Sequence, residues 1–489
     1  MPPVPGEPSR ARSEAPLAVV VLAAGRGVRM RSALPKVLHP VAGRPLLDRV
    51  LDTASAVLGD GPGSGRLVVV VGAGKERVAA HLAAASPGAL VVEQDPPRGT
   101  GDAVRVALPS AGDAGRVVVL SGDVPLLRPG TVRRLVEALD GEGEPAVAFL
   151  TAHLPEPGSY GRVVRDASGQ VLRVVEAKDA GEAERSIREV NAGVYAFDRA
   201  FLASALPRLS ADNAQGEYYL TDVLGLAAQA GRRVVGLPAG DAREMLGVNS
   251  RRELALLDGI LRSRAAEAAM DEGATLLRPE TITLDDGVAL AEDVVVEPFV
   301  TLSGSTRVGE GSRVGQGCVV VDSVLGAGVT LRPYCVVERT VVGDGAIVGP
   351  FARLREGTDL GPGVHVGNFV ETKKARLSRG AKANHLTYLG DVEVGEGTNV
   401  GAGVITCNYD GFAKHRTTIG AGVFVGSDVQ LVAPVTVEDG AVIGAGTTVT
   451  KDVPKDALAT SRVPQRTVEG GGAKYREKKR AAKAAAGSG

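Results

Sequence analysis

Two patterns of hydrophobic positions divide the chain. Up to about Gly240, short apolar runs alternate with stretches of helical periodicity. The apolar runs, which we expect to be strands, are Leu17–Ala24, Leu67–Val71, Ala89–Val92, Arg116–Leu120 and Ala146–Leu150. The stretches that we expect to be helices are Lys75–Ala85, Gly101–Ala107 and Thr131–Leu139. Short buried strands separated by helices predict a mainly parallel sheet with helices on both faces.

After about Leu276 the aliphatic positions recur every six residues. They form three runs: Leu290, Val296, Leu302, Val308, Val314 and Val320; Val342, Val348, Leu354, Leu360 and Val366; Ile419, Val425, Leu431, Val437, Ile443 and Val449. This period is neither that of a helix nor the alternation of a strand, and it is typical of a hexapeptide β-helix. Each hexad then contributes one inward aliphatic side chain, and stacked triangular coils of three hexads share a continuous core.

The six-residue period breaks twice. The register slips between Thr372 and Leu389, and extra residues intervene between Thr406 and Ile419. The breaks contain Lys373, Lys374, Arg376, His385, Asn408, Lys414, His415 and Arg416. Insertions in a solenoid project from one face, which is often the binding face, so we expect polar chemistry at these breaks.

Shifts in composition predict the domain boundaries. Residues 1–16 are rich in Pro, Ser and charge and are expected to be disordered, whereas 17–249 form the α/β domain. Residues 250–274 are a helical linker, because Arg251–Ala269 is amphipathic, and 275–469 form the β-helix. The basic segment 470–489 is expected to be a second disordered tail.

The overall composition excludes several classes of protein. The 489 residues include 56 Lys and Arg against 57 Asp and Glu, without the basic excess of a nucleic-acid-binding protein. The apolar run Leu17–Ala24 is much shorter than the roughly 20 residues that cross a bilayer, and it lacks the flanks of a signal peptide. The cysteines Cys318, Cys335 and Cys407 have no metal-ligand spacing and do not indicate an oxidising compartment.

A glycine-rich turn directly after the first strand predicts a phosphate site. Gly25 and Gly27 allow close approach of backbone amides to an anion, and Arg26, Arg29 and Lys36 supply positive charge nearby. The turn is not a Walker A loop, because no Gly-Lys-Ser/Thr follows. Its glycine spacing also differs from the dinucleotide fingerprint.

Asp123 follows the apolar strand Arg116–Leu120, at the strand end where α/β sheets place ligands. A carboxylate there suits Mg²⁺, which takes few protein ligands and completes its shell with phosphate oxygens and water. A turn or helix-capping role for Asp123 is the alternative. Asn249 is a candidate second ligand without a motif of its own.

His385 is the candidate base of the second half. Amide formation from an amine and a thioester needs a proton acceptor and an oxyanion stabiliser. The chain has six histidines, and His385 lies at a break of the hexad lattice beside basic residues. His365 and His415 are the local competitors. His365 precedes a regular hexad, and His415 lies in a basic loop.

An ordered set of motifs resembles one enzyme family. They are LAAGRGVRM, LPKVLH, GTGDAV, SGDVPL, SYGRVV, VVEAKD, VNAGVY, QGEYYLTD, GVNSR, GPFARLR, HVGNFVETKKARL, HLTYLGD, NVGAGVITCNYDG, VFVGSDVQLVAPV and TSRVPQ. Between about Ala18 and Gln465 the chain resembles the bifunctional N-acetylglucosamine-1-phosphate uridylyltransferases/glucosamine-1-phosphate acetyltransferases. The resemblance implies a Rossmann-like nucleotidyltransferase domain followed by a left-handed parallel β-helix.

The resemblance also implies the site residues of the first domain. UTP and UDP-N-acetylglucosamine would contact Leu22, Ala23, Ala24, Gly25, Arg29, Lys36, Gln94, Gly99, Thr100, Gly161, Glu176, Asn191 and Asn249. Mg²⁺ would bind Asp123 and Asn249. The sequence departs from the family at Ser121, where Tyr is frequent, and at Asp95–Arg98 before the Gly-Thr-Gly segment.

In the second domain the resemblance implies His385 as the catalytic base. Glucosamine 1-phosphate would contact Arg355, Lys373, Tyr388 and Asn399. Acetyl-CoA would contact Ala402, Asn408, Tyr409, Ser427, Ala445 and Arg462. The resemblance further implies a cytoplasmic homotrimer that makes UDP-N-acetylglucosamine, a precursor of peptidoglycan, with UTP and acetyl-CoA as co-substrates and with neither nucleic acid nor membrane as a partner.

Two other functions remain open at this point. One is a nucleotidylyltransferase whose β-helix only oligomerises it, or which acts on another sugar. The residues Lys373, His385 and Asn408 argue against a pure scaffold. The other is a non-catalytic regulatory subunit of similar architecture, which the intact Gly25, Arg29, Lys36 and Asp123 disfavour.

Overall fold

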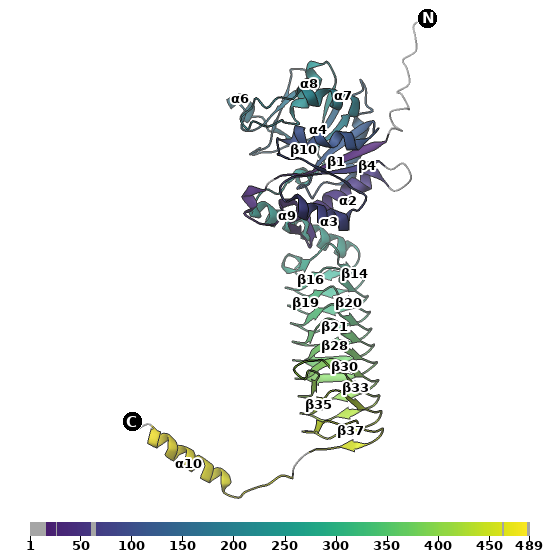
Figure 1. Ribbon diagram of the computed structural model, residues 1–489, viewed down its shortest axis with the longest axis vertical. Coiled ribbons are helices and arrows are strands. Elements are labelled where there is room, and N and C mark those ends of the chain that lie inside the picture. The colour runs from purple at the N-terminus through teal and green to yellow at the C-terminus, as the bar shows by residue number, and fades with distance from the viewer. Residues whose placement is uncertain (1–15, 26, 60–64, 462–463, 487–489) are drawn as a thin grey trace. The chain divides into compact units, whose positions relative to one another are not determined.

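A computed structural model of the chain describes residues 16–25, 27–59, 65–461 and 464–486 (Figure 1). It contains two compact units. Met1–Ala265 and Leu284–Asp286 form the N-terminal unit, and Ala266–Thr283 and Gly287–Gly489 form the β-helix unit. Apart from Pro16, the expected disordered segment 1–16 lies outside the described residues.

A mainly parallel sheet forms the centre of the N-terminal unit. Its strand order is β11-β7-β10-β6-β1-β4-β5; β8 pairs with β10, and β9 pairs with β8. The strands are β1 (Leu17–Ala23), β4 (Arg66–Val71), β5 (Leu90–Glu93), β6 (Arg116–Ser121), β7 (Val147–His153), β8 (Arg162–Arg165), β9 (Val171–Val175), β10 (Glu189–Asp198) and β11 (Val234–Pro238). Strand β10 is antiparallel to β6 and β7, whereas β1, β4, β5 and β6 pair in parallel.

Helices cover both faces of this sheet, as predicted. They are α2 (Leu46–Leu58), α3 (Lys75–Ala85), α4 (Thr100–Ala107), α5 (Pro129–Ala138), α6 (Glu182–Arg185), α7 (Arg199–Ala205) and α8 (Asp222–Gln229). Alternation along β1 divides the core, because Val20 packs with residues of α4, α7 and α8, and Val19 packs with residues of α2, α3 and α5. The remaining short elements are β2 (Pro40–Val41), β3 (Arg44–Pro45), η1 (Val28–Met30), η2 (Lys36–Leu38), η3 (Leu108–Ala111), η4 (Leu206–Arg208), η5 (Ala242–Met245) and η6 (Pro279–Thr281).

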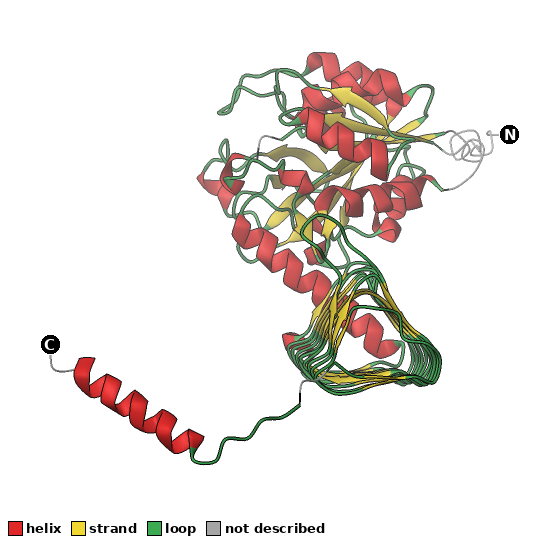
Figure 2. Cartoon of the chain, turned by 60° about the horizontal axis from the view of Figure 1, so that its bottom comes forward, coloured by secondary structure: helices red, strands yellow, loops and turns green. Residues whose placement is uncertain are grey.

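The second unit is a parallel β-helix with a triangular cross-section (Figure 2). One sheet contains β12 (Thr275–Leu276), β15 (Val295–Val296), β18 (Arg313–Val314), β21 (Thr330–Leu331), β24 (Ile347–Val348), β27 (His365–Asn368), β29 (Lys382–His385), β31 (Asn399–Val400), β34 (Phe424–Val425), β37 (Val442–Ile443) and β39 (Leu458–Ala459). Every aliphatic residue in the three predicted runs is buried, which confirms the hexapeptide lattice.

The remaining sides of the triangle belong to a 17-stranded sheet. Its strands are β13 (Thr283–Leu284), β14 (Ala289–Leu290), β16 (Thr301–Ser303), β17 (Arg307–Val308), β19 (Val319–Val321), β20 (Val324–Leu325), β22 (Val336–Glu338), β23 (Val341–Val342), β25 (Arg353–Leu354), β26 (Asp359–Leu360), β28 (Glu371–Leu377), β30 (Tyr388–Val394), β32 (Ile405–Cys407), β33 (Thr417–Ile419), β35 (Gln430–Val432), β36 (Val435–Val437) and β38 (Thr448–Val449). At the first break of the period, β28 and β30 run continuously across a corner. At the second, residues 408–416 form a loop closed by the bridge Tyr409–Lys414.

Helices α9 (Arg251–Asp271) and α10 (Gly471–Ala486) flank the β-helix in the sequence. Helix α9 occupies most of the predicted linker. The segment expected to be a disordered basic tail contains helix α10, in which residues 471–486 are helical and none of them is buried. The physical reason is that Ala, Lys, Arg and Glu, which make up most of this segment, all have high helix propensity.

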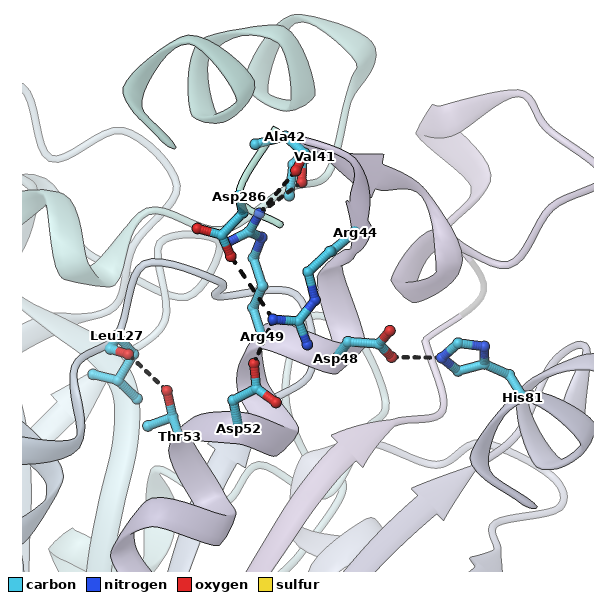
Figure 3. Close-up of polar contacts among 10 residues, drawn as sticks. All are labelled: Val41, Ala42, Arg44, Asp48, Arg49, Asp52, Thr53, His81, Leu127 and Asp286. Carbon is cyan, nitrogen blue, oxygen red and sulfur yellow. Dashed lines mark hydrogen bonds and ion pairs between the residues drawn. The ribbon is translucent and has the colours of Figure 1, made fainter. Parts of the chain in front are cut away.

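A polar cluster holds the segment Leu284–Asp286 in the N-terminal unit, although this segment follows α9 in the chain (Figure 3). The buried Arg49 of α2 lies with Nη1 3.1 Å from Asp286 Oδ2, and its Nη2 donates to the carbonyl oxygens of Val41 and Ala42. Burial lowers the pKa of the Arg49 guanidinium, and the Asp286 carboxylate opposes that shift. Arg262 adds an ion pair of 2.7 Å to Asp285.

Replacing Arg49 by Ala is expected to lower the free energy of unfolding of the N-terminal unit by about 2 kcal/mol, because one carboxylate and two carbonyls lose a charged donor. Arg44→Ala is the matched control. Arg44 is 38% exposed and pairs with Asp52, so its loss should cost less than about 1 kcal/mol. Urea denaturation followed by circular dichroism measures both, and equal losses would contradict the role of Arg49.

Candidate active sites

A cavity of about 480 Å³ lies in the N-terminal unit where β1, β5 and β6 end. It is lined by Leu22, Ala24, Gly25, Lys36, Val37, Gln94, Pro97, Gly99, Thr100, Ala103, Ser121, Asp123 and Glu217. Parallel strands bring their carboxyl ends to one edge of the sheet, so three loops that are distant in the sequence share this cavity.

The cavity is lined by seven of the thirteen residues predicted to contact UTP and UDP-N-acetylglucosamine, and six lie outside its lining: Ala23, Arg29, Gly161, Glu176, Asn191 and Asn249. Ala23 is the buried last residue of β1, and Arg29 lies exposed on η1. Val37, Pro97, Ala103 and Glu217 also line the cavity and were not predicted from the sequence. Glu217 lies in the motif QGEYYLTD, which was the only available signal for it.

Lys36 is the centre of the charged part of the cavity. Its Nζ contacts Asp123 Oδ2 and lies 3.2 Å from Asn249 Oδ1. The Ser121 hydroxyl donates to Asp123 Oδ1 over 2.7 Å. Asn249 precedes α9, and its backbone N–H donates to Glu253 Oε2, which also accepts from Ser250. The two predicted metal ligands therefore converge on one cationic atom.

The start of α4 forms another wall of the cavity. Gln94 Nε2 donates to the Gly99 carbonyl and to Asp102, which fixes the approach to the helix. Gly99 has φ of 108°, and an added Cβ would lie 2.6 Å from the Tyr218 carbonyl oxygen, so only glycine fits here. The N-terminus of α4 at Thr100 thus lies at the cavity, where its free backbone N–H groups favour an anion.

The residues predicted to surround the sugar and ribose lie close to one another, outside the lining of this cavity. The Asn191 N–H donates to the Gly161 carbonyl, and a Cβ on Gly161 would lie 3.6 Å from both Glu176 carboxylate oxygens. Burial raises the pKa of the Glu176 carboxyl, although a hydrogen bond from Thr221 Oγ1 opposes the shift. Asn191 Nδ2 also donates to the buried Tyr195 hydroxyl over 2.7 Å.

One corner of the β-helix carries a vertical column of four predicted acetyl-transfer residues: His385, Ala402, Ser427 and Ala445. We call it the His385 column. His385 is the last residue of β29, and the other three each lie two residues after a strand of the 11-stranded sheet. Hydrogen bonds to successive carbonyls come from Gly403 to His385, from Asp428 to Ala402 and from Gly446 to Ser427. His385 is exposed, and its Nδ1 lies 3.3 Å from Asn368 Oδ1. Coil stacking thus aligns residues that are far apart in the sequence.

A group of cations lies on the adjoining 17-stranded sheet. Arg355 forms an ion pair of 2.8 Å with Glu371, which is in register with Tyr388. The charges of Lys414 and Arg355 lower the pKa of Lys373, so the three cations are close enough to repel one another. This concentration of positive charge suits a phosphate.

The loop after β32 carries Asn408 and Tyr409. Asn408 Nδ2 donates to Asp391 Oδ2 over 2.5 Å, whereas the Tyr409 side chain is 61% exposed. His415 pairs with Asp410 within the same loop, over 2.7 Å, and is therefore engaged by a carboxylate, unlike His385.

Two other predicted residues stand apart from these groups. Asn399 lies on β31 of the 11-stranded sheet, in register with Lys382, whereas Arg355, Lys373 and Tyr388 lie along the 17-stranded sheet. One chain therefore distributes the predicted sugar-phosphate residues over two sides of the triangle. Arg462 lies outside the described residues.

Comparison with known proteins gives consistent matches for both halves. Residues 19–194 match the MobA-like NTP transferase domain, and residues 416–451 match the bacterial transferase hexapeptide family of six repeats. A bifunctional protein GlmU of Sorangium cellulosum is 48% identical over 460 residues, which cover 93% of this chain and 96% of the relative. Another, of Anaeromyxobacter sp. (strain Fw109-5), is 49% identical over 461 residues, which cover 94% and 93%.

The raised pKa of Glu176 predicts a pH-dependent cost to stability. The folded state holds this proton more tightly than the unfolded state, so stability falls as pH rises from the ordinary glutamate pKa through the raised folded value. Glu176→Gln should therefore raise the melting temperature at about pH 8, and the gain should shrink near pH 4. Thermal unfolding at both pH values tests this, with the exposed Glu182→Gln as control. A gain that is independent of pH would contradict it.

Proposed function

The chain belongs to the family of bifunctional GlmU proteins, and we propose that each of its two units carries out one of the two reactions. The protein is an enzyme that transfers acetyl from acetyl-CoA to glucosamine 1-phosphate. It then transfers uridylyl from UTP to N-acetylglucosamine 1-phosphate and releases pyrophosphate. We assign the uridylyl step to the cavity of about 480 Å³ and the acetyl step to the His385 column and its neighbouring cations.

In the uridylyl step, a phosphate oxygen of the sugar phosphate attacks the α-phosphorus of UTP, and pyrophosphate leaves. No protein nucleophile is required, so the protein's task is to hold two anions in line and neutralise their charge. Lys36, the turn at Gly25 and the start of α4 at Thr100 form the cavity wall and can hold the phosphates. Gly161, Glu176 and Asn191 would bind the sugar and ribose, and Arg29 would reach UTP from η1.

Asp123 and Asn249 would hold Mg²⁺, which neutralises phosphate charge when bound. Their side-chain oxygens contact the same Lys36 ammonium and therefore face one point, and both are hard oxygen donors of the kind that Mg²⁺ prefers. Among the described residues, no cluster of three His, Cys, Asp or Glu side chains offers a richer metal site. Asp123 and Asn249 therefore fit a cation that takes few protein ligands.

In the acetyl step, His385 accepts a proton from the amine that attacks the thioester carbonyl. When Asn368 Oδ1 accepts from His385 Nδ1–H, Nε2 is left as the unprotonated acceptor. Arg355 and Lys373 would bind the sugar phosphate, with Tyr388 and Asn399 ordering the sugar. Asn408 would orient the amine, and the Ser427 hydroxyl would stabilise the oxyanion. Ala402, Tyr409, Ala445 and Arg462 would contact acetyl-CoA.

The assembly that we propose is a homotrimer of β-helices. Exposed aromatic rings support it: Tyr334, Phe351 and Phe369 stack with centroids 5.3 and 5.5 Å apart, and we call them the aromatic ladder. Their φ angles are 56 to 63°, an unfavourable conformation for bulky residues that burial against a partner would repay. Asn399 lies on a different side of the triangle from Arg355 and Lys373. This separation supports a site between two copies of the chain, in which one copy supplies Asn399 and the other supplies Arg355 and Lys373.

We place the enzyme in the cytoplasm, where UTP and acetyl-CoA are made. The three cysteines are free thiols, as is usual for a protein kept in a reducing compartment. No helix in the described part of the chain has the length and apolar content that a bilayer crossing requires.

Separate sites predict separable losses of activity. His385→Ala should reduce release of free coenzyme A thiol by about 100-fold or more, the usual range for a lost general base, while pyrophosphate release from the acetylated sugar persists. Asp123→Ala should have the opposite pattern. His365→Ala is the matched control, because His365 lies on the same sheet but outside the His385 column. Loss of both activities in either variant would contradict independent sites.

The aromatic ladder predicts an oligomerisation defect. Substituting both Phe351 and Phe369 by Ser should convert trimers to monomers in sedimentation velocity, because the partner contacts lose two large apolar side chains. Thiol release should fall with the trimer, and pyrophosphate release should remain. Leu172→Ser, an exposed position in the N-terminal unit, is the control. If the variant stays trimeric, the aromatic ladder is not part of the trimer interface.

A further inference from the structure

Lys36 lies where a cation bound by Asp123 and Asn249 would lie. Its ammonium contacts Asp123 Oδ2 and is 3.2 Å from Asn249 Oδ1, and the side chains of Lys36 and Asp123 are only 12% and 14% exposed. The backbone fixes the lysine from the other side, because a Cβ at Gly27 would lie 2.8 Å from Lys36 Cβ. The ammonium is therefore built into the wall of the cavity.

The two oxygen donors are supported independently of any metal. Ser121 Oγ donates to Asp123 Oδ1, and the backbone of Asn249 is held by Glu253 at the start of α9. A carboxylate as enclosed as Asp123 is costly without a positive partner. Lys36 supplies that partner and at the same time keeps Asp123 and Asn249 aimed at one point.

An ammonium and a divalent cation that both contacted Asp123 Oδ2 would repel each other strongly, because the side chains of Lys36 and Asp123 are largely screened from solvent. Entry of the metal thus requires Lys36 to leave the carboxylate. The same lysine lines the cavity proposed for UTP, so a phosphate group can accept the displaced ammonium.

We propose that Lys36 is an exchangeable counter-ion of the metal site, which holds the ligands before loading and makes metal and nucleotide bind together. The proposal rests on the assignment of Asp123 and Asn249 as metal ligands. Metal alone must displace the lysine without compensation and binds weakly. Metal with nucleotide transfers the lysine to phosphate and binds more tightly, which is a coupling free energy between the two ligands.

The test is Mn²⁺ binding to the full chain without nucleotide, measured from the electron paramagnetic resonance signal of free Mn²⁺. Lys36→Met should tighten Mn²⁺ binding by about tenfold or more, within the range of typical coupling between sites. Lys36→Arg keeps the counter-charge and should bind as weakly as the wild type. Arg31→Met removes a positive charge from the preceding segment and should change the affinity by less than about twofold.

Two further variants separate this proposal from the metal assignment. If Asp123→Asn abolishes Mn²⁺ binding but Lys36→Met leaves the affinity unchanged or weaker, the metal site stands and the exchange is refuted. If the double variant Lys36→Met/Asp123→Asn binds as tightly as Lys36→Met, Asp123 is not the ligand and the assignment itself fails. Circular dichroism of each variant shows whether the unit remains folded, and the gain in affinity in Lys36→Met cannot arise from unfolding.

Discussion

Parallel pairing of strands is the constraint on which both active sites depend. In the N-terminal unit it brings the ends of β1, β5 and β6 to one edge, so that Gly25, Gln94 and Asp123 share a cavity. In the β-helix it places equivalent corners of successive coils above one another, so that His385 and Ser427 share a column. In each case, backbone hydrogen bonds position chemistry that no local contact could assemble.

Charge is handled differently in the two units. The site proposed for uridylyl transfer pairs its cation and carboxylate internally, and the side chains of Lys36 and Asp123 are only 12% and 14% exposed. The β-helix instead gathers Arg355, Lys373 and Lys414, whose mutual repulsion depresses the pKa of Lys373. Such a group gains most from an incoming dianion, because the ligand relieves the repulsion as it binds. The two proposed sites thus offer a phosphate opposite arrangements of the same charged groups.

Much of the fold was predictable because its signals are local. The helix over Lys75–Ala85 and the inward aliphatics of the three hexad runs follow from periodicity, which reports directly which face of an element is buried. The antiparallel insertion of β10 between β6 and β7 was not predicted, since the apolar pattern of a central strand is the same in both directions. For α10, the composition that suggested disorder was also that of a good helix former.

The two architectures, the glycine turn, and the residue types available for phosphate and acyl chemistry can be recognised along the chain, because each depends on neighbouring residues. Which of those residues meet depends on how the chain folds in three dimensions. Lys36 reaches partners 87 and 213 positions away, Asp286 returns to Arg49, and Asn399 lies on a different side of the triangle from Lys373. Periodicity specifies the face that a residue occupies, whereas the order of strand pairing and the stacking of coils specify what lies opposite it.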